Sequence, residues 1–246
     1  MKLHLLGTGG YHPSDIRHTA CLMLPEMGVV FDAGSAFYRV RDLIETSQLD
    51  VFLSHIHLDH VMGLTFLFDV LHDKDVADVR IHSEPEKLAA LETHLFHELI
   101  FPKLPPLRFV PLAESVSLPG GATLTHFPIP HPGGSRGYRI DWPDRSLAYV
   151  TDTTAIANAD YIPLIRGVDV LIHECYFPDG REDYAELTGH SCATPVAKVA
   201  KAAKVGRLVL VHVNPITGQH DPIGIQRVRK IFPKATLGVD EEAIDF

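Results

Sequence analysis

The sequence predicts a layered α/β fold that forms one compact domain over residues 1–246. Apolar runs typical of buried strands alternate along the chain with segments that favour helix. Polar side chains of the kind that bind metals follow several of these runs, at the carboxyl ends where α/β sheets place their sites. The chain has 246 residues, of which 46% are hydrophobic, and no segment has the composition of a linker. These features predict a single domain with a substantial core.

The strands are predicted from apolar runs that end at turn residues. They cover residues 2–6, 20–24, 29–31, 49–53, 79–82, 107–111, 115–118, 123–127, 147–150, 168–172 and 207–211. The first strand ends in Gly7-Thr8-Gly9-Gly10. Because no Gly-Lys-Ser/Thr follows, this turn favours close approach of the backbone to a site over a nucleotide-binding loop. The second and third strands form a hairpin about residues 25–28.

The helices are predicted where the apolar pattern changes. They cover about residues 35–46, 61–68, 87–99 and 193–204. The third follows Ser83-Glu84-Pro85-Glu86, which has the form of a capping box with an early proline. It carries His94 and His97, which we expect in solvent or at the rim of a substrate pocket. The fourth is rich in Ala, Val and Lys, and Gly206 is expected at its C′ position.

The stretch Ser54-His55-Ile56-His57-Leu58-Asp59-His60 carries the strongest chemical signal. It follows a buried strand, so His55 and His57 share one face of an extended backbone, while Asp59 and His60 lie where the chain turns into helix. A lone histidine is more often an ordinary loop residue. Three imidazoles and a carboxylate so close together instead match the ligands of Zn²⁺ and its transition-metal neighbours. Two ligands followed by two adjacent ones also match a pair of metals.

Charge and cysteine content narrow the function classes. The formal net charge is -9, from 31 acidic and 22 basic residues. This field repels a long nucleic acid, whereas a small anionic substrate fits a site made locally positive by two divalent cations. Cys21, Cys175 and Cys192 are too few for a disulfide framework and are expected as free thiols. No membrane span or secretory segment is recognisable, so we expect a cytoplasmic protein.

The motif His-x-His-x-Asp-His after an apolar strand resembles the signature of the metallo-β-lactamase fold superfamily. Nearly the whole chain is similar to the ribonuclease Z-like and phosphodiesterase branch of that superfamily. The other matching segments are Leu6-Gly7-Thr8-Gly9, Phe31-Asp32-Ala33-Gly34, His131 with Gly137-Tyr138-Arg139-Ile140, Thr151-Asp152-Thr153, His173-Glu174, Gly189-His190-Ser191, and His212 with Pro215. The resemblance implies a four-layer αββα sandwich with a dimetal site on one edge.

The resemblance also implies the metal ligands. They are His55, His57, Asp59, His60, His131, Asp152 and His212. His131 would join the first two histidines at one metal, His212 would join Asp59 and His60 at the other, and Asp152 would bridge both. His131 lies between two prolines, which fix its backbone. Nitrogen and oxygen ligands without Cys allow Zn²⁺, Mn²⁺ or Fe, and Zn²⁺ is the most frequent in the family.

The implied reaction is hydrolysis by a hydroxide that bridges two metals and attacks phosphorus in line. Asp59 would ligate metal and accept the hydrogen bond of the hydroxide, and Glu174 would orient a ligand or His190. His190 has three open roles: it protonates the leaving oxygen, binds the phosphate, or caps the helix that begins near Ala193. Asp32 either orients a metal-bound histidine or stabilises its turn.

The sequence departs from ribonuclease Z in ways that favour a small or cyclic phosphodiester as substrate. Asp152 follows His131 by 21 positions (131 to 152), too few for the arm that grips transfer RNA in ribonuclease Z. The Pro-x-Lys-x-Arg-Asn loop of the family is Pro13-Ser14-Asp15-Ile16-Arg17-His18 here, and the net charge is strongly negative.

Several alternatives stay open at this point. They are a hydrolase of a lactone, thioester or sulfate ester on the same dimetal site, a transfer-RNA 3′-processing endonuclease, and a non-catalytic metal-binding protein. Relatives of ribonuclease Z are often dimers, so the resemblance leaves a homodimer open.

Overall fold

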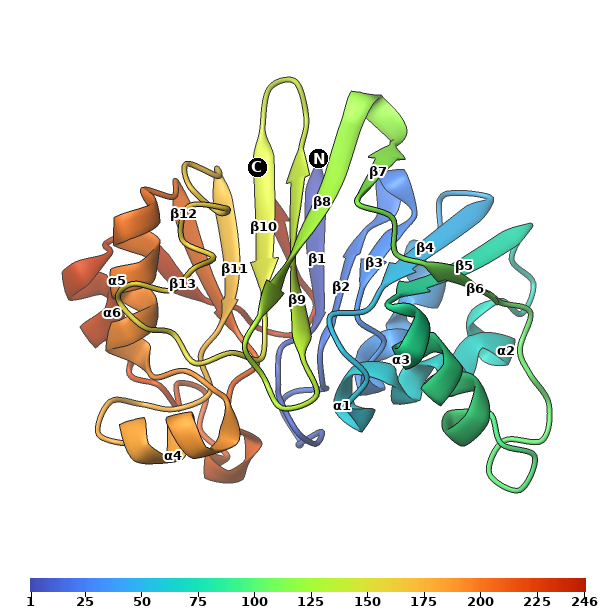
Figure 1. Cartoon of the computed structure of the whole chain (residues 1–246), viewed down its shortest axis with the longest axis horizontal. Coiled ribbons are helices and arrows are strands. Elements are labelled where there is room, and N and C mark those ends of the chain that lie inside the picture. The colour runs from blue at the N-terminus through green and yellow to red at the C-terminus, as the bar shows by residue number, and fades with distance from the viewer. The chain divides into compact units, whose positions relative to one another are not determined.

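The computed structural model describes residues 1–246, apart from the side chain of Thr217. Within these residues the chain divides into two compact units, each built on one seven-stranded sheet (Figure 1). Unit 1 comprises residues 1–13, 17–113 and 240–245, and unit 2 comprises residues 14–16, 114–239 and 246. The expectation of one domain over residues 1–246 stays a prediction.

The sheet of unit 1 has the strand order β14-β1-β2-β3-β4-β5-β6. The strands are β1 (Lys2–Gly7), β2 (Cys21–Leu24), β3 (Val29–Phe31), β4 (Gln48–Phe52), β5 (Asp78–Ser83), β6 (Arg108–Pro111) and β14 (Glu242–Asp245). Pairing is antiparallel from β14 to β3 and parallel from β3 to β6. The direction of pairing therefore changes at β3.

The helical segments of unit 1 are short. They are η1 (Pro25–Met27), η2 (Ser35–Leu43), α1 (Leu58–Val61), η3 (Met62–Phe66), α2 (Leu67–Val70), α3 (Pro85–Ala90) and η4 (Leu91–Leu95). The expected helix over residues 35–46 is a 3-10 segment, and the one over 87–99 ends earlier, in the π-helical turn η4. Apolar side chains from these segments and from one face of the sheet form the core, including Phe37, Val51 and Leu64.

The capping box predicted at residues 83–86 is wrong. Ser83 is the last residue of β5, where it pairs with Pro111, and the N-cap of α3 is Glu84. The strand therefore continues one residue beyond its predicted end and takes the serine out of the capping position.

The sheet of unit 2 has the strand order β13-β12-β11-β10-β9-β8-β7. The strands are β7 (Ser115–Leu118), β8 (Ala122–Ile129), β9 (Ser135–Asp141), β10 (Ser146–Val150), β11 (Val170–Glu174), β12 (Arg207–Val211) and β13 (Ala235–Leu237). Pairing is antiparallel from β7 to β10 and parallel from β10 to β13. Here the direction of pairing changes at β10.

The helical segments of unit 2 are η5 (Pro119–Gly121), α4 (Glu182–Thr188), α5 (Ala193–Ala203), η6 (Pro215–Thr217) and α6 (Ile225–Ile231). Helices α5 and α6 lie side by side (Figure 1), and α5 packs on β11. Their apolar faces and the parallel strands form a core that includes Leu171, Val196 and Leu210. Elements α4, α6, β9, β13 and β14 were not among those predicted from the sequence.

The end of α5 differs from the prediction. Lys204, with a φ of 53°, takes the left-handed C-cap conformation that was expected near Gly206. Gly206 has a different role, because a Cβ at this position would lie 2.6 Å from the carbonyl oxygen of Asp169. The glycine permits close approach of two backbone segments.

The two sheets have one feature in common near the strand at which the direction of pairing changes. An aspartate follows the strand at which the pairing changes direction: Asp32 comes directly after β3, and Asp152 comes two residues after β10. Their φ angles are 58° and 53°. This left-handed conformation costs free energy for most residues but is better tolerated by aspartate.

No helix in the described part of the chain is long and apolar enough to cross a membrane.

Gly63 is expected to tolerate no side chain. Its N–H donates to the carbonyl of Ala33 at 2.7 Å. A Cβ here would lie 2.3 Å from both the carbonyl oxygen of Gly34 and the Cβ of Phe37. Because backbone atoms would have to move, Gly63→Ala should lower the free energy of unfolding by about 1–3 kcal/mol in urea denaturation. Gly9→Ala, whose Cβ would come no closer than 3.2 Å, is the control, and equal losses would contradict this account.

Candidate metal site

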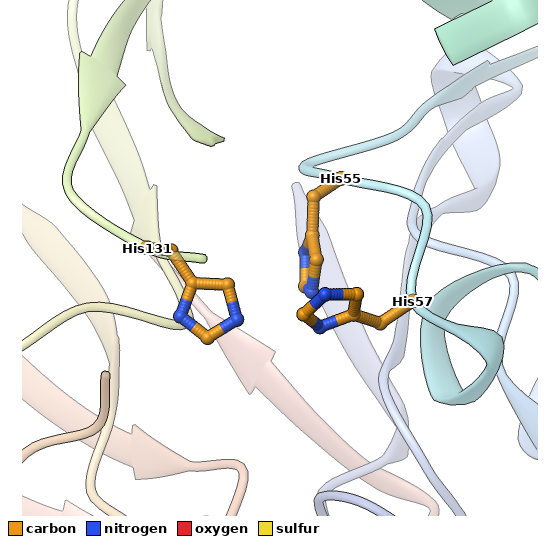
Figure 2. Close-up of side chains that lie close together, drawn as sticks. All are labelled: His55, His57 and His131. Carbon is orange, nitrogen blue, oxygen red and sulfur yellow. The ribbon is translucent and has the colours of Figure 1, made fainter. Parts of the chain in front are cut away.

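Unit 1 presents the central motif beyond the end of β4. His55 and His57 follow the strand in extended chain, and α1 begins at Leu58, so Asp59 and His60 lie on the first turn of the helix. The ring centroids of His55 and His57 are 4.4 Å apart (Figure 2), and those of His55 and His60 are 4.2 Å apart. The strand-to-helix corner therefore gathers the three imidazoles.

Asp32 fixes both His60 and the backbone that precedes the motif. Its fully buried carboxylate accepts the N–H of Ser54 at 2.7 Å and contacts Nδ1 of His60 at 2.9 Å. Because a carboxylate only accepts, Nδ1 of His60 carries the proton and Nε2 presents its lone pair. Asp32 thus orients an imidazole and holds the backbone of Ser54, whereas the alternative that it stabilises its own turn stays a prediction.

Ser54 extends this arrangement to His55. Its Oγ lies 2.9 Å from Oδ2 of Asp32 and 3.0 Å from Nδ1 of His55. The hydroxyl proton goes to the carboxylate, so Nδ1–H of His55 donates to Ser54 and Nε2 of His55 keeps its lone pair. Such outer partners set the tautomer of metal-binding histidines.

The backbone of Tyr11 orients Asp59. Its N–H donates to Oδ2 of Asp59 at 2.8 Å, and the same oxygen lies 3.4 Å from Nε2 of His60. Tyr11 has a φ of 64°, which an aromatic residue rarely adopts. Tyr11 was not predictable from the sequence, because a backbone donor leaves no side-chain signature. The glycine-rich turn that precedes Tyr11 was the available signal, and its predicted approach to a site stays a prediction.

Unit 2 gathers four predicted residues, three of which lie beyond the ends of its strands and one, His190, beyond α4. His131 follows β8 by two residues, Asp152 follows β10, and His212 directly follows β12. Asp152 lies at the centre, with its carboxylate oxygens 3.8 Å from Nε2 of His131, 3.8 Å from Nδ1 of His190 and 3.4 Å from Nε2 of His212. Ligand atoms of Asp152, His190 and His212 all lie within 4.8 Å of one another.

Two of these residues have strained backbones. Asp152 and His212 have φ angles of 53° and 54°, and both are almost completely buried. Left-handed residues other than glycine persist only where the surrounding structure holds them, and they concentrate at functional sites. The strain therefore supports a functional role for both side chains.

The imidazole of His131 is oriented by a loop of unit 2. Its Nδ1–H donates to the carbonyl of Gly189 at 3.1 Å, so Nε2 presents its lone pair toward Asp152 (His131 is labelled in Figure 2). Gly189 has a φ of 74°, and a Cβ here would lie 2.8 Å from Nδ1 of His131. The glycine is therefore required by both backbone conformation and space.

The carboxylate of Glu174 connects the segments that carry Asp152 and His190. It is fully buried and accepts the N–H of Thr153 at 2.8 Å and the N–H of Ser191 at 3.2 Å. It also contacts Nδ1 of His190 at 3.2 Å. This is the contact expected of a residue that orients His190.

Tyr176 holds two imidazoles and was not predicted. Its ring stacks on His190, with centroids 4.5 Å apart and planes at 14°, and lies 5.8 Å from the ring of His212. In sequence Tyr176 is one more apolar residue after a strand, so only the tertiary structure shows its contacts.

The helix-cap alternative for His190 is wrong, because the N-cap of α5 is Cys192.

His173 belongs to the core of unit 2. The hydroxyl of Tyr161 donates to Nε2 of His173 at 2.9 Å, and Nδ1–H of His173 donates to the carbonyl of Glu174 at 2.7 Å. Burial lowers the pKa of His173 below its ordinary value of 6.5, so the ring is neutral. Of the helix histidines, His94 lines a groove and His97 is exposed.

The donors fit a divalent metal ion. In His60 and His131 the proton is on Nδ1, and Nε2 faces a carboxylate oxygen at 3.4 Å and 3.8 Å respectively. A lone pair facing a carboxylate is repulsive, and a cation between the two removes that repulsion. Imidazole nitrogen and carboxylate oxygen are the donors that Zn²⁺, Mn²⁺ and Fe accept.

Solved structures confirm the fold class. The metallo-β-lactamase fold protein YhfI from Bacillus subtilis aligns with a TM-score of 0.79 and 20% identity over 99% of each chain. The short form of human tRNase Z aligns with a TM-score of 0.77 and 22% identity over 100% of this chain and 99% of its own. The expected α/β sandwich of metallo-β-lactamase type is therefore correct. Its fold is thus of the metallo-β-lactamase type, and its imidazole and carboxylate clusters contain the donors of a metal site.

The sequence comparison then gives the family. The chain belongs to the beta-lactamase superfamily, whose domain profile matches residues 29–213. Among curated proteins, ribonuclease Z of Metallosphaera sedula is 26% identical over 98% of this chain and 97% of its own length. The predicted resemblance to the superfamily and to its ribonuclease Z-like branch is confirmed.

Removing the Glu174 carboxylate should destabilise unit 2. Glu174→Ala leaves buried donors without their acceptor, so the free energy of unfolding should fall by about 3–5 kcal/mol. Glu174→Gln keeps one acceptor oxygen and should lose about 1–3 kcal/mol. Urea denaturation of the metal-free protein measures both. Glu182→Ala, on an exposed position of α4, is the control, and a loss as small as that of the control would refute the role of Glu174.

His173 should make stability depend on pH. Because burial holds its pKa below 6.5, the unfolded chain binds a proton that the folded protein does not, and stability is lost as the pH falls below about 6.5. The slope from this residue is at most about 1.4 kcal/mol per pH unit. In urea denaturation of the metal-free protein, His173→Gln should lack this slope, whereas the exposed-site variant His72→Gln should keep it. Identical pH profiles for wild type and His173→Gln would contradict the prediction.

Proposed function

We propose that the chain is a metal-dependent phosphodiesterase whose substrate is a small or cyclic phosphodiester. The observation that carries the proposal is the orientation of the imidazoles. In His55, His60 and His131 the proton lies on Nδ1, which donates to a serine oxygen, a carboxylate and a carbonyl. Three Nε2 lone pairs are thereby preset for metal binding.

We assign two divalent ions to ligands from both units. The proposed set is His55, His57, Asp59, His60, His131, Asp152 and His212. The assignment across the units rests on the pattern of the family, and the contacts within each unit support its own part. Asp152 is the proposed bridging ligand, Zn²⁺ is the first choice of metal, and Mn²⁺ or Fe are alternatives with the same donor preference.

The residues of the chain have separate tasks in the proposed reaction. When bound, the two ions supply Lewis-acid activation and a water molecule of lowered pKa. Asp59, held by the N–H of Tyr11, is placed to accept a hydrogen bond from the attacking water. His190 is held at Nδ1 by Glu174, so Nε2 is the atom left to protonate a leaving oxygen or to bind the phosphate.

The length of the chain supports a small substrate. The match to ribonuclease Z of Metallosphaera sedula runs over 291 positions, whereas this chain has 246 residues, so at least 45 positions of that relative (291 less 246) have no counterpart here. The net charge of -9 also disfavours a long polyanion. Both observations agree with the absence of a transfer-RNA arm between residues 131 and 152.

Two other hydrolase activities are compatible with the same set of residues. Transfer-RNA 3′-processing is favoured by the name of the ribonuclease Z relatives. A lactone, thioester or sulfate ester is also attacked by a metal-activated water. The cytoplasmic location and the homodimer stay predictions.

Asp152→Ala should remove both metal and activity. Wild type is expected to carry about two metal ions per chain and to hydrolyse bis(p-nitrophenyl) phosphate, and the variant should lose metal and at least about 100-fold in kcat/KM, since a lost outer partner alone costs 10–100-fold. For each protein, the metal content by elemental analysis and the hydrolysis rate are measured on the same preparation. Asp160→Ala, a nearby exposed carboxylate, is the matched control.

The same assay separates the alternatives. Activity that survives in Asp152→Ala would overturn the bridging ligand. Faster hydrolysis of p-nitrophenyl acetate or sulfate than of the phosphodiester would replace the proposed substrate class, and cleavage of precursor transfer RNA at a higher kcat/KM would restore the processing endonuclease.

A further inference from the structure

Unit 1 has an apolar groove beside the central motif. Its volume is about 480 Å³, which is the size of a small-ligand site. It is lined by Ile56, Leu58, Val61, Ala90, Leu91, His94, Leu95 and Ile100. Among these described lining residues, His94 is the one polar side chain.

One wall of the groove belongs to the same stretch of chain as the candidate ligands. Ile56 lies between His55 and His57 in sequence, and Leu58 lies between His57 and Asp59. Leu58 is 71% exposed, so its side chain is accessible at this wall. The apolar wall and the candidate ligands therefore belong to one stretch of chain.

The opposite wall comes from α3, the π-helical turn η4 and the segment that follows. Leu91 and Leu95 belong to η4, and Ile100, which lies beyond it, is 69% exposed. Single π-helical turns are uncommon and are found mostly at functional sites. Exposed apolar side chains on both walls mark a surface that favours an apolar ligand.

We infer that this groove binds the uncharged alkyl or aryl group of a phosphodiester substrate. The inference rests on the proposed function, because it assigns the phosphate to the candidate ligands and the alcohol portion to the groove. No lysine or arginine occurs among the described lining residues, so the groove offers no partner to a second phosphate. The preferred substrate is thus a phosphodiester with an apolar alcohol.

A series of p-nitrophenyl alkyl phosphodiesters tests the inference. The alkyl group is lengthened from methyl to hexyl while the leaving group stays the same. In the wild type, kcat/KM should rise about two- to fourfold per methylene, because burying one methylene contributes at most about 0.8 kcal/mol. A flat series would overturn the inference.

Substitutions test whether the dependence of kcat/KM on alkyl length arises in the groove. Leu58→Asn and Ile100→Asn change exposed side chains on opposite walls, so both should fold and should flatten the series. Leu99→Asn is the matched control, because Leu99 is 86% exposed, neighbours Ile100 and is absent from the lining. Flattening by Leu99→Asn as well would overturn the assignment to the groove.

A binding measurement separates this inference from the proposed function. In the metal-free protein, 1-hexanol should shift the methyl NMR signals of Leu58, Leu91 and Ile100 but not those of Leu187, which is 78% exposed in unit 2. These shifts without any phosphodiesterase activity would keep the groove and refute the proposed function. Shifts spread over all exposed methyls would refute the groove. A dimer that Leu58→Asn converts to a monomer in sedimentation would assign the groove to a second copy of the chain and overturn the inference.

Discussion

The buried carboxylate of Asp32 is the constraint on which the site of unit 1 depends. A fully buried aspartate must be matched by donors, and it finds them in the backbone of Ser54, the hydroxyl of Ser54 and Nδ1 of His60. Satisfying the carboxylate therefore fixes the tautomers of two imidazoles and the course of the chain into α1. The contacts that stabilise the fold here are the same contacts that leave the Nε2 lone pairs to the proposed metal.

Unit 2 also contains a fully buried carboxylate that hydrogen-bond donors must match. It belongs to Glu174, and its donors are the N–H groups of Thr153 and Ser191 together with His190. Asp152 occupies the place along the sheet that Asp32 occupies in unit 1, with the same left-handed backbone. In unit 1 this aspartate orients a histidine, whereas in unit 2 it lies among three histidines and is the proposed ligand. The same position after the strand therefore carries a residue that orients a histidine in unit 1 and the proposed metal ligand in unit 2.

The sheets explain why the site residues lie where they do. Each sheet is antiparallel on one side and parallel on the other, and the chain leaves β3 and β10 at the change of direction. In α/β sheets, ligands bind beyond the carboxyl ends of the strands near such a point. The candidate ligands of each unit follow strand ends or the adjoining helix, and Ile56 and Leu58 of the same motif line the apolar groove of unit 1. A phosphodiester with an apolar alcohol would match this neighbouring pair of surfaces.

The sequence by itself determined the kind of chemistry and most of the scaffold. Local chain geometry alone brings together the four polar residues that closely follow one apolar run, His55, His57, Asp59 and His60. The strands were predicted from apolar runs that end at turn residues. The contacts of Tyr11, Tyr176 and Ser54, and those of Asp32 to Ser54 and His60, were decided by the tertiary structure. These residues act through partners distant in sequence, through a backbone N–H or through strained φ angles, and none of these leaves a local pattern. Short elements such as α4, β9 and β14 were also undetermined, because packing and strand pairing rather than intrinsic propensity stabilise them.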